Sequence, residues 1–383
     1  SHGVLFFTFA CKYSIIKFQF FHFYKNDSIK KLLMSLVRNR IKSSITLGKI
    51  FESLSKEQSW PGFEIGLSEE EYSNGLETIN MSVHHNGWFT KQSVQTALSS
   101  WAKALTEESL EDWLSHYKEN NTPPKKIGII AAGNIPMVGL HDILCILLSG
   151  NSALIKLSSK DAHLMMMVIG YLQILDPDLK NSIQVVHGKL EGFDAVIATG
   201  SNNSSRYFEY YFKDKPSIIR KNRTSVAVLT GDESKEEMSL LGKDIFTYFG
   251  LGCRNVTKLY LAEGYNLDKF FNGIYEFKEI GNHNKYANNY DYHRAIWLLN
   301  GEDLLENGFI LFKQDESLVS PVGTLYYEFY SSKTELAEKL NDKKEQIQCV
   351  VSADDVPFGK AQEPELMDYP DGVDTMEFLL ALQ

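Results

Sequence analysis

Cysteine is scarce in this chain, and its four cysteines are far apart. They are Cys11, Cys145, Cys253 and Cys349 among 383 residues, with no Cys-x-x-Cys pair and no Cys/His spacing suited to zinc. His84 and His85 have no nearby carboxylate or cysteine to complete a metal site, so a polar loop is the better reading there. We therefore expect no metal. Few, scattered cysteines are typical of a reducing compartment, and we expect the protein in the cytoplasm.

Clustered positive charge is also lacking. The chain has 39 Lys and Arg against 49 Asp and Glu, a net charge of -10, and no basic stripe. These features argue against a nucleic-acid partner. Its hydrophobic fraction of 43% and charged fraction of 23% are those of an ordinary globular protein, and its length allows two domains.

No apolar run is long enough to span a bilayer. Lys12 and Lys17 interrupt the aromatic-rich stretch Val4–Tyr24, and the start lacks the basic residues and cleavage site of a signal peptide. A more ordinary sequence opens at Met34. We expect no membrane span, and we expect residues 1–33 to be an extension outside the fold.

The glycine fingerprint of dinucleotide-binding folds is missing as well. Gly250 and Gly252 match the first two glycines of Gly-x-Gly-x-x-Gly, but Asn255 stands where the third is required.

Two segments with different periodicity follow one another. Residues 35–117 have apolar residues at helical intervals, and Ser68–Glu71 resembles a capping box. From residue 126, short apolar strands alternate with helices, which is typical of a parallel α/β sheet. The expected strands are Lys126–Ala132, Ala153–Lys156, Ile183–Val186, Ala195–Ala198 and Ser225–Leu229, with helices at Val138–Leu148, Asp161–Leu175 and Arg206–Phe212.

A second α/β unit is expected after Gly231. Its expected helices are Ser234–Phe249 and Lys333–Leu340, and its expected strands include Val256–Leu261, Ala295–Leu299, Gly308–Phe312 and Gln346–Val351. Residues 282–292, rich in Tyr and Asn, either line a substrate channel or form a surface loop with packed aromatics.

Cys253 stands at the glycine turn that opens this unit's first strand. Little side-chain bulk shields a thiol there, and Arg254 and exposed backbone N–H groups favour the nucleophilic thiolate. The alternative is that Cys253 is a small buried hydrophobic residue, the commoner role of a single cysteine.

With these elements in place, residues 34–383 resemble the acyl-CoA reductases of the bioluminescence fatty-acid-reductase (LuxC-like) type, a branch of the aldehyde dehydrogenase superfamily. The resemblance rests on an ordered set of segments. These are Ile130–Pro136, Gly150–Ser159, Ala198–Ser201, the turn of Cys253, the stretch from Glu316 to Val322, and the tail Ala361–Thr375.

The resemblance implies the fold class and the roles of the site residues. The fold is α/β and aldehyde-dehydrogenase-like, with two Rossmann-like parallel-sheet domains and an active-site cleft between them. Cys253 takes the nucleophile position and Asn134 binds the oxyanion. The cofactor-binding residues are Lys156, which reaches the adenosine ribose, Ser159 in the same segment, Gly200 and Ser201 under the pyrophosphate, and Glu316 at the nicotinamide ribose.

Four of these assignments have a simpler explanation when each residue is read by itself. Asn134 could stabilise its turn, Lys156 could be a solvated charge, Ser201 could cap the following helix, and Glu316 could belong to a polar run.

The sequence departs from the hydrolytic aldehyde dehydrogenases at their general base. The base glutamate of their Glu-Leu-Gly-Gly segment corresponds most simply to Leu229, with Asp232 or Glu233 as alternative bases. The residue before the nucleophile is Gly252 rather than a polar residue. Both changes disfavour oxidation of an aldehyde to an acid, because no obvious residue activates a water.

We therefore predict an NAD(P)H-dependent reduction of an acyl-CoA or acyl-protein thioester to a fatty aldehyde through a cysteine acyl-enzyme. The alternatives are another reductase of the superfamily, acting on acyl phosphate or short-chain acyl-CoA, and a non-catalytic nucleotide-binding relative. The expected parts are residues 34–230 for cofactor binding, 231–350 for catalysis, and 351–383 as a tail packing back on the cofactor domain or on a partner subunit. A homo-oligomer is expected, with an acyl-supplying enzyme as a further possible partner.

Overall fold

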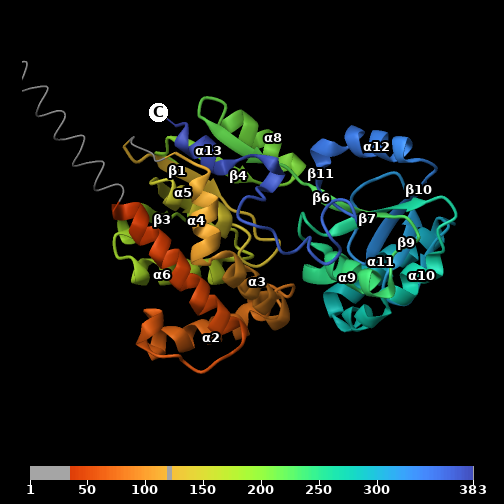
Figure 1. Ribbon diagram of the computed structural model, residues 1–383, viewed down its shortest axis with the longest axis horizontal. Helices are drawn as coiled ribbons and strands as arrows, with labels where there is room; N and C mark the ends of the chain where they lie inside the picture. The colour runs from red at the N-terminus through yellow and green to blue at the C-terminus, as the bar shows by residue number, and fades with distance from the viewer. Residues whose placement is uncertain (1–34, 119–122, 383) are drawn as a thin grey trace, which may run out of the picture.

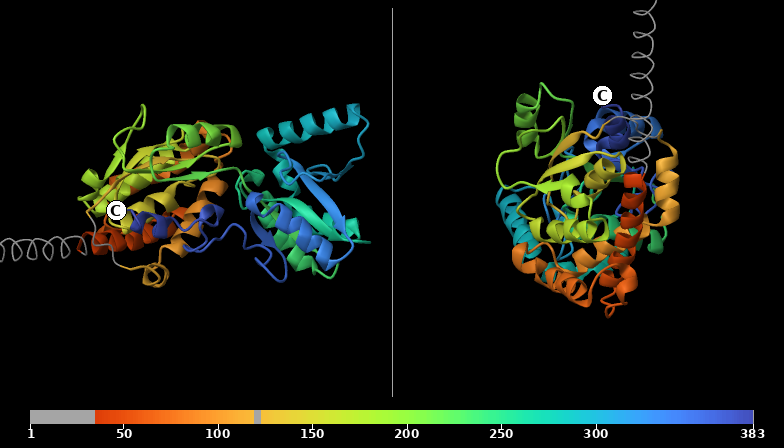
Figure 2. Two further views of the ribbon diagram at one scale, coloured as in Figure 1. Left: turned by 90° about the horizontal axis from the view of Figure 1, so that it is seen from above. Right: turned by 90° about the vertical axis from the view of Figure 1, so that its left-hand side faces the viewer.

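The computed structural model describes residues 35–118 and 123–382 and has two lobes, each built on its own sheet (Figure 1). The extension expected at residues 1–33 lies outside the described residues. Figure 2 shows the lobes side by side, with separate segments of the chain crossing between them.

The first lobe contains a five-stranded parallel sheet in the order β3-β2-β1-β4-β5. Its strands are β1 (Lys126–Ile130), β2 (Ser152–Lys156), β3 (Ile183–Val185), β4 (Ala195–Thr199) and β5 (Ser217–Arg220). The inner strands are continuous apolar runs because both faces of the sheet are covered. The predicted parallel α/β sheet is confirmed.

Helices cover both faces of this sheet. They are the helix over residues 35–55, α2 (Glu69–His85), α3 (Lys91–Ala104), α4 (Glu107–Ser115), α5 (Leu140–Leu148), α6 (Ala162–Leu175), α7 (Leu179–Ser182) and α8 (Asn202–Tyr211). Most of them share one large core with one face of the sheet, while Phe208 and Phe212 pack with the other face. The predicted capping box of α2 is present, with Ser68 and Glu71 bonding each other's backbone N–H.

The second lobe contains a six-stranded sheet in the order β11-β6-β7-β10-β9-β8, parallel except for β8. Its strands are β6 (Thr224–Leu229), β7 (Val256–Ala262), β8 (Leu305–Glu306), β9 (Leu311–Gln314), β10 (Thr324–Tyr330) and β11 (Ile347–Val351). Its helices are α9 (Lys235–Phe246), α10 (Leu267–Gly273), α11 (Asn284–Leu299) and α12 (Lys333–Asp342).

Three expectations about local structure were wrong, and one strand was missed. Strand β6, expected with the first unit, pairs with β7 and β11 in the second sheet. The stretch Ala295–Leu299 is the end of α11 and not a strand, because its apolar residues continue a helix that begins at Asn284. Strand β5 was not predicted, since Ser217–Arg220 is short and follows a polar turn. His84 and His85 form the last turn of α2 and not a loop.

The tail returns from the second sheet to the first lobe (Figure 1). After β11 it passes through extended and turn segments and ends in α13 (Thr375–Leu380), which packs against α5. Arg220, only 3% exposed, fastens it: its guanidinium pairs with Asp142 at 2.6 Å and donates hydrogen bonds to Thr375 Oγ1 and the Pro370 carbonyl. The tail is therefore an integral part of the first lobe's core.

Over the described residues, none of the helices has the length and apolar character needed to cross a bilayer.

Candidate active site

Cys253 lies in a tight turn between α9 and β7. The backbone before it is left-handed at three consecutive residues, Tyr248 (φ 54°), Phe249 (φ 59°) and Gly250 (φ 77°). Two of these are not glycine, and such backbone is costly for a residue with a side chain. The predicted glycine turn is therefore tighter than its two glycines alone would require.

The buried side chain of Asn255 holds this turn in place. Its Oδ1 accepts a hydrogen bond from the Gly252 N–H at 2.8 Å, and its Nδ2 donates to the carbonyl oxygens of Asp244 at 3.0 Å and Thr247 at 2.7 Å. One amide thus joins the end of α9 to the turn, and a satisfied buried polar group of this kind fixes one conformation.

Asn134 reaches this turn from the other lobe. It follows β1, and its side-chain Nδ2 donates a hydrogen bond to the Leu251 carbonyl at 2.7 Å. Ile135 packs beside Gly252, where an added Cβ would lie 3.6 Å from its Cδ1. The structure therefore brings the two predicted catalytic segments together, although they belong to different sheets.

A mostly apolar cavity of about 160 Å³ opens at Cys253. Its wall is formed by one face of α3, the turn after β1 with the start of α5, the turn of Cys253 itself, Gln348 of β11, and the tail. The lining residues include Ala97, Ser100, Trp101, Ala104, Ile135, Pro136, Val138, His141, Gln362, Leu366 and Pro370. The sequence had not assigned α3 or the tail to the site, because nothing local in either segment indicates that it faces a cysteine far along the chain.

The environment of the thiol differs from the expectation. Burial raises the pKa of Cys253 above its ordinary value, and Asp371 and Cys349 add to the increase, while the neighbouring Arg254 lowers it. Arg254 lowers the pKa of Cys253, as predicted, but burial raises this pKa by more. The guanidinium is also engaged by the tail, since Nε donates to the Ala361 carbonyl and Nη2 lies 3.8 Å from Asp368. The resting group is thus a thiol and not the predicted thiolate.

His141 lines the same cavity, but its two ring nitrogens are both engaged. Nε2 lies 2.9 Å from the Leu366 carbonyl, and Nδ1 lies 3.6 Å from the sulfur of Cys145. A carbonyl can only accept, so Nε2 carries the proton. Burial lowers the pKa of His141, which keeps the ring neutral. This histidine shapes the cavity wall and is not a free base.

The residues considered as a general base lie at the wrong end of β6. Ser225, near the start of the strand, donates a hydrogen bond to the Cys253 carbonyl at 3.1 Å. Leu229 ends the strand roughly 16 Å from its start, at a rise of about 3.3 Å per residue. Glu233 caps the turn beyond it, accepting from the N–H groups of Thr230 and Gly231. Leu229 and the alternative bases Asp232 and Glu233 therefore lie away from the start of β6, where the Cys253 carbonyl is held.

The predicted cofactor residues of the first lobe gather at one edge of its sheet. Lys156 ends β2. Its side chain is exposed and has no hydrogen bond or ion pair to the described part of the chain, while its backbone carbonyl accepts from the Ala131 N–H. Ser159 follows on the exposed loop after β2. Gly200 and Ser201 follow β4, and Ser201 caps α8 by accepting from the Ser204 N–H at 3.2 Å. Carboxyl ends of parallel strands are where such sheets bind ligands.

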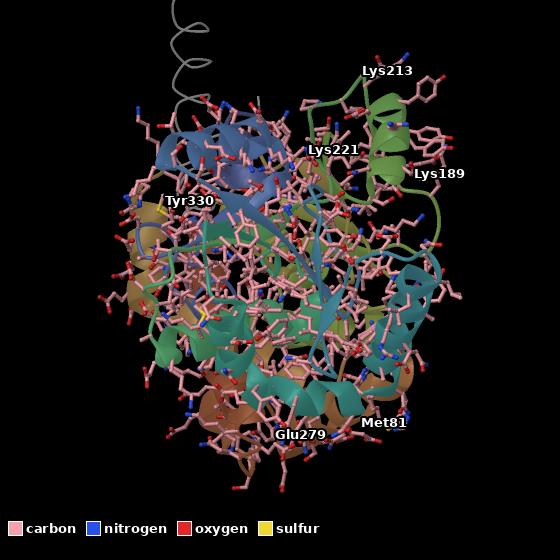
Figure 3. The ribbon with its side chains drawn as sticks, turned by 90° about the vertical axis from the view of Figure 1, so that its right-hand side faces the viewer. Met81, Lys189, Lys213, Lys221, Glu279 and Tyr330 are labelled. Carbon is pink, nitrogen blue, oxygen red and sulfur yellow. The ribbon has the colours of Figure 1, made fainter. Side chains whose placement is uncertain are left out.

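Gly200 brings the turn after β4 close to α8. A Cβ on Gly200 would lie 2.8 Å from both Phe208 and Ser204, so a side chain there would collide with α8. The N-terminus of α8 directly follows this turn, and helix N-termini are common anion sites. Figure 3 shows Lys189, Lys213 and Lys221 around α8 on this corner of the molecule.

Glu316 lies apart from these residues. It is exposed on the loop after β9 and lines an open hollow with Glu302, Lys313, Asp315 and Lys339. This hollow has no lining residue in common with the cavity at Cys253. None of residues 282–292 is among the lining residues of the Cys253 cavity. Most of them form the first turns of α11 and not a loop. Within residues 35–118 and 123–382, no cluster of three potential metal ligands occurs.

Comparison with known proteins identifies a matching family. A family model described as acyl-CoA reductase (LuxC) matches residues 69–272, just over half of the chain. No curated protein sequence matches it.

Three solved structures of similar fold are aldehyde dehydrogenases. The putative aldehyde dehydrogenase PutA from Anabaena variabilis has a TM-score of 0.53 at 15% identity, over 80% of this chain and 77% of that chain. ALDH21 from Physcomitrella patens, in complex with the reaction product succinate, has a TM-score of 0.55 at 13% identity, over 86% and 83%. A mutant of P. syringae AldA indole-3-acetaldehyde dehydrogenase, in complex with NAD+ and IAA, has a TM-score of 0.56 at 13% identity, over 83% and 73%.

Proposed function

This chain belongs to the acyl-CoA reductase (LuxC) family of oxidoreductases, and from this premise we propose that it reduces a long-chain acyl thioester to the fatty aldehyde with NADPH or NADH. One observation carries the proposal. A half-buried cysteine, Cys253, opens into an apolar cavity, and the turn that bears it accepts a hydrogen bond from the amide of Asn134.

The first step forms the acyl-enzyme. The Cys253 sulfur attacks the thioester carbonyl carbon, the C–S bond to the leaving thiol breaks, and that thiol departs with a proton. Because burial keeps the resting sulfur protonated, the proton of Cys253 has to be transferred as the bond forms. The apolar wall of the cavity accommodates the acyl chain, at about 0.8 kcal/mol for each buried methylene.

The oxyanion formed in this step needs hydrogen-bond donors. The Asn134 amide has two N–H groups, and its bond to Leu251 uses one of them. We assign the other to the oxyanion, together with the backbone N–H of Cys253. Losing one such donor costs about 3 kcal/mol, or roughly a hundredfold in rate.

The nicotinamide cofactor is assigned to the edge formed by Lys156, Ser159, Gly200 and Ser201. AldA, a relative in fold, was solved with NAD+. When bound, the cofactor supplies hydride to the acyl carbon. Asn134 then holds the tetrahedral oxyanion until the carbon–sulfur bond to Cys253 breaks, which releases the aldehyde and leaves Cys253 as the thiolate. A proton from solvent restores the thiol. We keep Glu316 as a candidate for the nicotinamide ribose only with a movement of its loop, because it lines a separate hollow.

The groups first considered as activators of water do not serve this site. The segment around Leu229 contributes no carboxylate to the described lining of the cavity, and His141 is engaged on both nitrogens. The two carboxylates that do line it belong to the tail, where Asp368 accepts from the Glu365 N–H and lies 3.8 Å from Arg254. The loss of the base at Leu229 suits a reductase, in which the acyl-enzyme has to persist until reduction, better than an acid-forming dehydrogenase. The further assignments, cytoplasmic location, self-association and delivery of the acyl group by a partner enzyme, are part of the same proposal.

The test is acylation without cofactor. Wild-type protein incubated with labelled palmitoyl-CoA should acquire one thioester on Cys253, and adding NADPH or NADH should release fatty aldehyde. Cys253→Ala should abolish both reactions, while Cys349→Ala, which removes a different buried cysteine, should preserve them. Absence of label on the wild type would indicate a non-catalytic nucleotide-binding protein. Faster reduction of acyl phosphate than of acyl-CoA would assign the chain to a different reductase class.

A further inference from the structure

Asp161 is a buried acidic residue whose side chain does not cap its own helix, α6. It is the N-cap residue of α6, the position at which an aspartate usually accepts a hydrogen bond from its helix, but its side chain makes no such bond. Instead its Oδ2 accepts from the backbone N–H of Met137 at 2.9 Å. The residue is 2% exposed, so this contact lies inside the protein.

Met137 ends the turn that carries Asn134, and its backbone is strained. Its φ of 57° is in the left-handed region, which is unfavourable for a residue with a long side chain. Strain of this kind persists only where the surroundings impose it. The hydrogen bond from the Met137 N–H to Asp161 is one such constraint.

The same turn is pressed against the loop after β2. A Cβ on Gly133 would lie 2.5 Å from the Oγ of Ser158 and 3.2 Å from the Cβ of Asp161, so no side chain fits between them. The loop of Ser158 also carries Lys156 and Ser159, the residues assigned to the cofactor. Asp161 therefore stands where the turn of Asn134 and the cofactor loop meet.

We propose that Asp161 is a positioning residue for the oxyanion site: by holding the Met137 N–H, it fixes the turn that aims Asn134 at the loop of Cys253. This inference deepens the proposed function and rests on it. It assigns the carboxyl group no contact with substrate.

The surroundings of the second oxygen of Asp161, Oδ1, decide which substitutions can test this proposal. Oδ1 is buried and has no hydrogen-bond partner in the described chain. Burial raises the pKa of Asp161 to about 8, opposed only by the Met137 N–H, and no charged side chain of the turn, of the 156–160 loop or of α6 contributes. The group is therefore a neutral acid at pH 7. Asparagine matches it in shape and can still accept from Met137, whereas serine restores a cap for α6 but is too short to reach Met137.

The variants are Asp161→Ser, Asp161→Asn and, as a matched control, Asp176→Ser. Asp176 is the other buried carboxylate of α6, lies at its C-terminal end, and also has an oxygen without a partner in the described chain. Two measurements are made: the rate of Cys253 acylation by palmitoyl-CoA, and backbone hydrogen exchange of the peptide covering residues 132–139. Thermal melting checks that each variant is folded.

Asp161→Ser is expected to slow acylation at least tenfold with little change in the half-saturating palmitoyl-CoA concentration, and to speed exchange at Met137 at least tenfold. Asp161→Asn should remain within threefold of wild type at pH 7.

Unchanged exchange at Met137 in Asp161→Ser would overturn the proposal, and so would an equal loss of acylation in Asp176→Ser. If wild type itself acquires no acyl group, the proposed function fails, while hydrogen exchange still decides whether Asp161 holds the turn.

Discussion

Asn134 and Leu251 belong to different lobes, and the Asn134 side-chain amide donates a hydrogen bond to the Leu251 carbonyl at 2.7 Å. Asn134 follows the first strand of the first sheet, and Leu251 precedes Cys253 by two residues at the entrance to the second. This bond brings an amide beside the loop of the thiol, with a second N–H that we assign to the oxyanion. It accounts for a site that neither lobe could form alone.

Replacing Asn134 by aspartate should slow the reaction without unfolding the protein. The carboxylate keeps the shape of the amide but removes both N–H donors and adds a negative charge where an oxyanion forms. We expect acylation and kcat to fall roughly a hundredfold or more, equivalent to about 3 kcal/mol. Stopped-flow measurement with palmitoyl-CoA would test this. Asn74→Asp, on the exposed face of α2, is the control and should have no effect.

Labelling of Cys253 by iodoacetamide should require alkaline pH. Burial raises the pKa of this thiol, so at pH 7 the thiolate fraction is smaller than that of a free cysteine and the rate climbs as pH approaches the raised pKa. Arg254 lowers the same pKa, so Arg254→Gln should slow labelling further at each pH. Arg254→Lys, which keeps the charge, should remain nearer wild type. Rapid labelling of the wild type at pH 6 would contradict this account.

Narrowing the cavity should shift acyl-chain preference. Ala104 lines it from the last turn of α3, and leucine at this position would occupy space that we assign to the acyl chain. We expect Ala104→Leu to lower kcat/KM for palmitoyl-CoA by about tenfold or more relative to hexanoyl-CoA, because two or three methylenes lose their contacts at about 0.8 kcal/mol each. Gln92→Leu adds the same side chain to the exposed start of α3 and should leave the ratio unchanged.

Removing the charge of Asp244 should loosen the tail. This carboxylate is fully buried and accepts hydrogen bonds from the backbone N–H groups of Gly359 at 2.6 Å and Ala361 at 3.0 Å. Asparagine can accept only through its single oxygen, which leaves one N–H poorly paired. We expect Asp244→Asn to reduce the free energy of unfolding by about 1–3 kcal/mol in urea titrations.

The pH dependence of this loss has a definite sign. Burial raises the pKa of Asp244 to about 6 from 3.8, although the two N–H groups and Arg254 oppose the increase. Because the pKa of Asp244 is higher in the folded than in the unfolded protein, protonation of Asp244 stabilises the folded state. This stabilisation is complete below about pH 4 and is lost as pH rises through 6. The stability difference between wild type and Asp244→Asn should therefore shrink over that range. Asp232→Asn, at an exposed site, should show no such trend.

Most local structure could be predicted because its signals are local. The Ser68 capping box, the apolar strand at Lys126–Ile130 and the strand after Cys253 were identified from a few adjacent residues each. Errors arose where neighbours in space decided the outcome. Strand β6 follows β5 after only three residues, and nothing in its sequence indicates that its hydrogen-bond partners lie in another sheet.

The candidate site likewise has residues that local sequence indicated and contacts that it did not. Asn134, Lys156 and Ser201 stand at the carboxyl ends of strands, and a parallel sheet brings such positions to one edge, so their sequence context indicated them. Cys253 was indicated by its glycine turn before a strand of the other sheet. The cavity wall from α3 and the tail, the engaged state of His141 and the contact between Asp161 and Met137 join residues far apart along the chain. Local patterns carry no information about such pairings.

The sequence by itself determined an α/β protein with two strand-rich units and a cysteine at a glycine turn, because periodicity and turn residues act over short stretches. Only the tertiary structure decided that this thiol is protonated at rest, that the tail and α3 wall its cavity, and that the carboxylates after β6 lie too far away to serve it. Burial and charge depend on every segment packed around a group, and those segments come together only when the chain has folded.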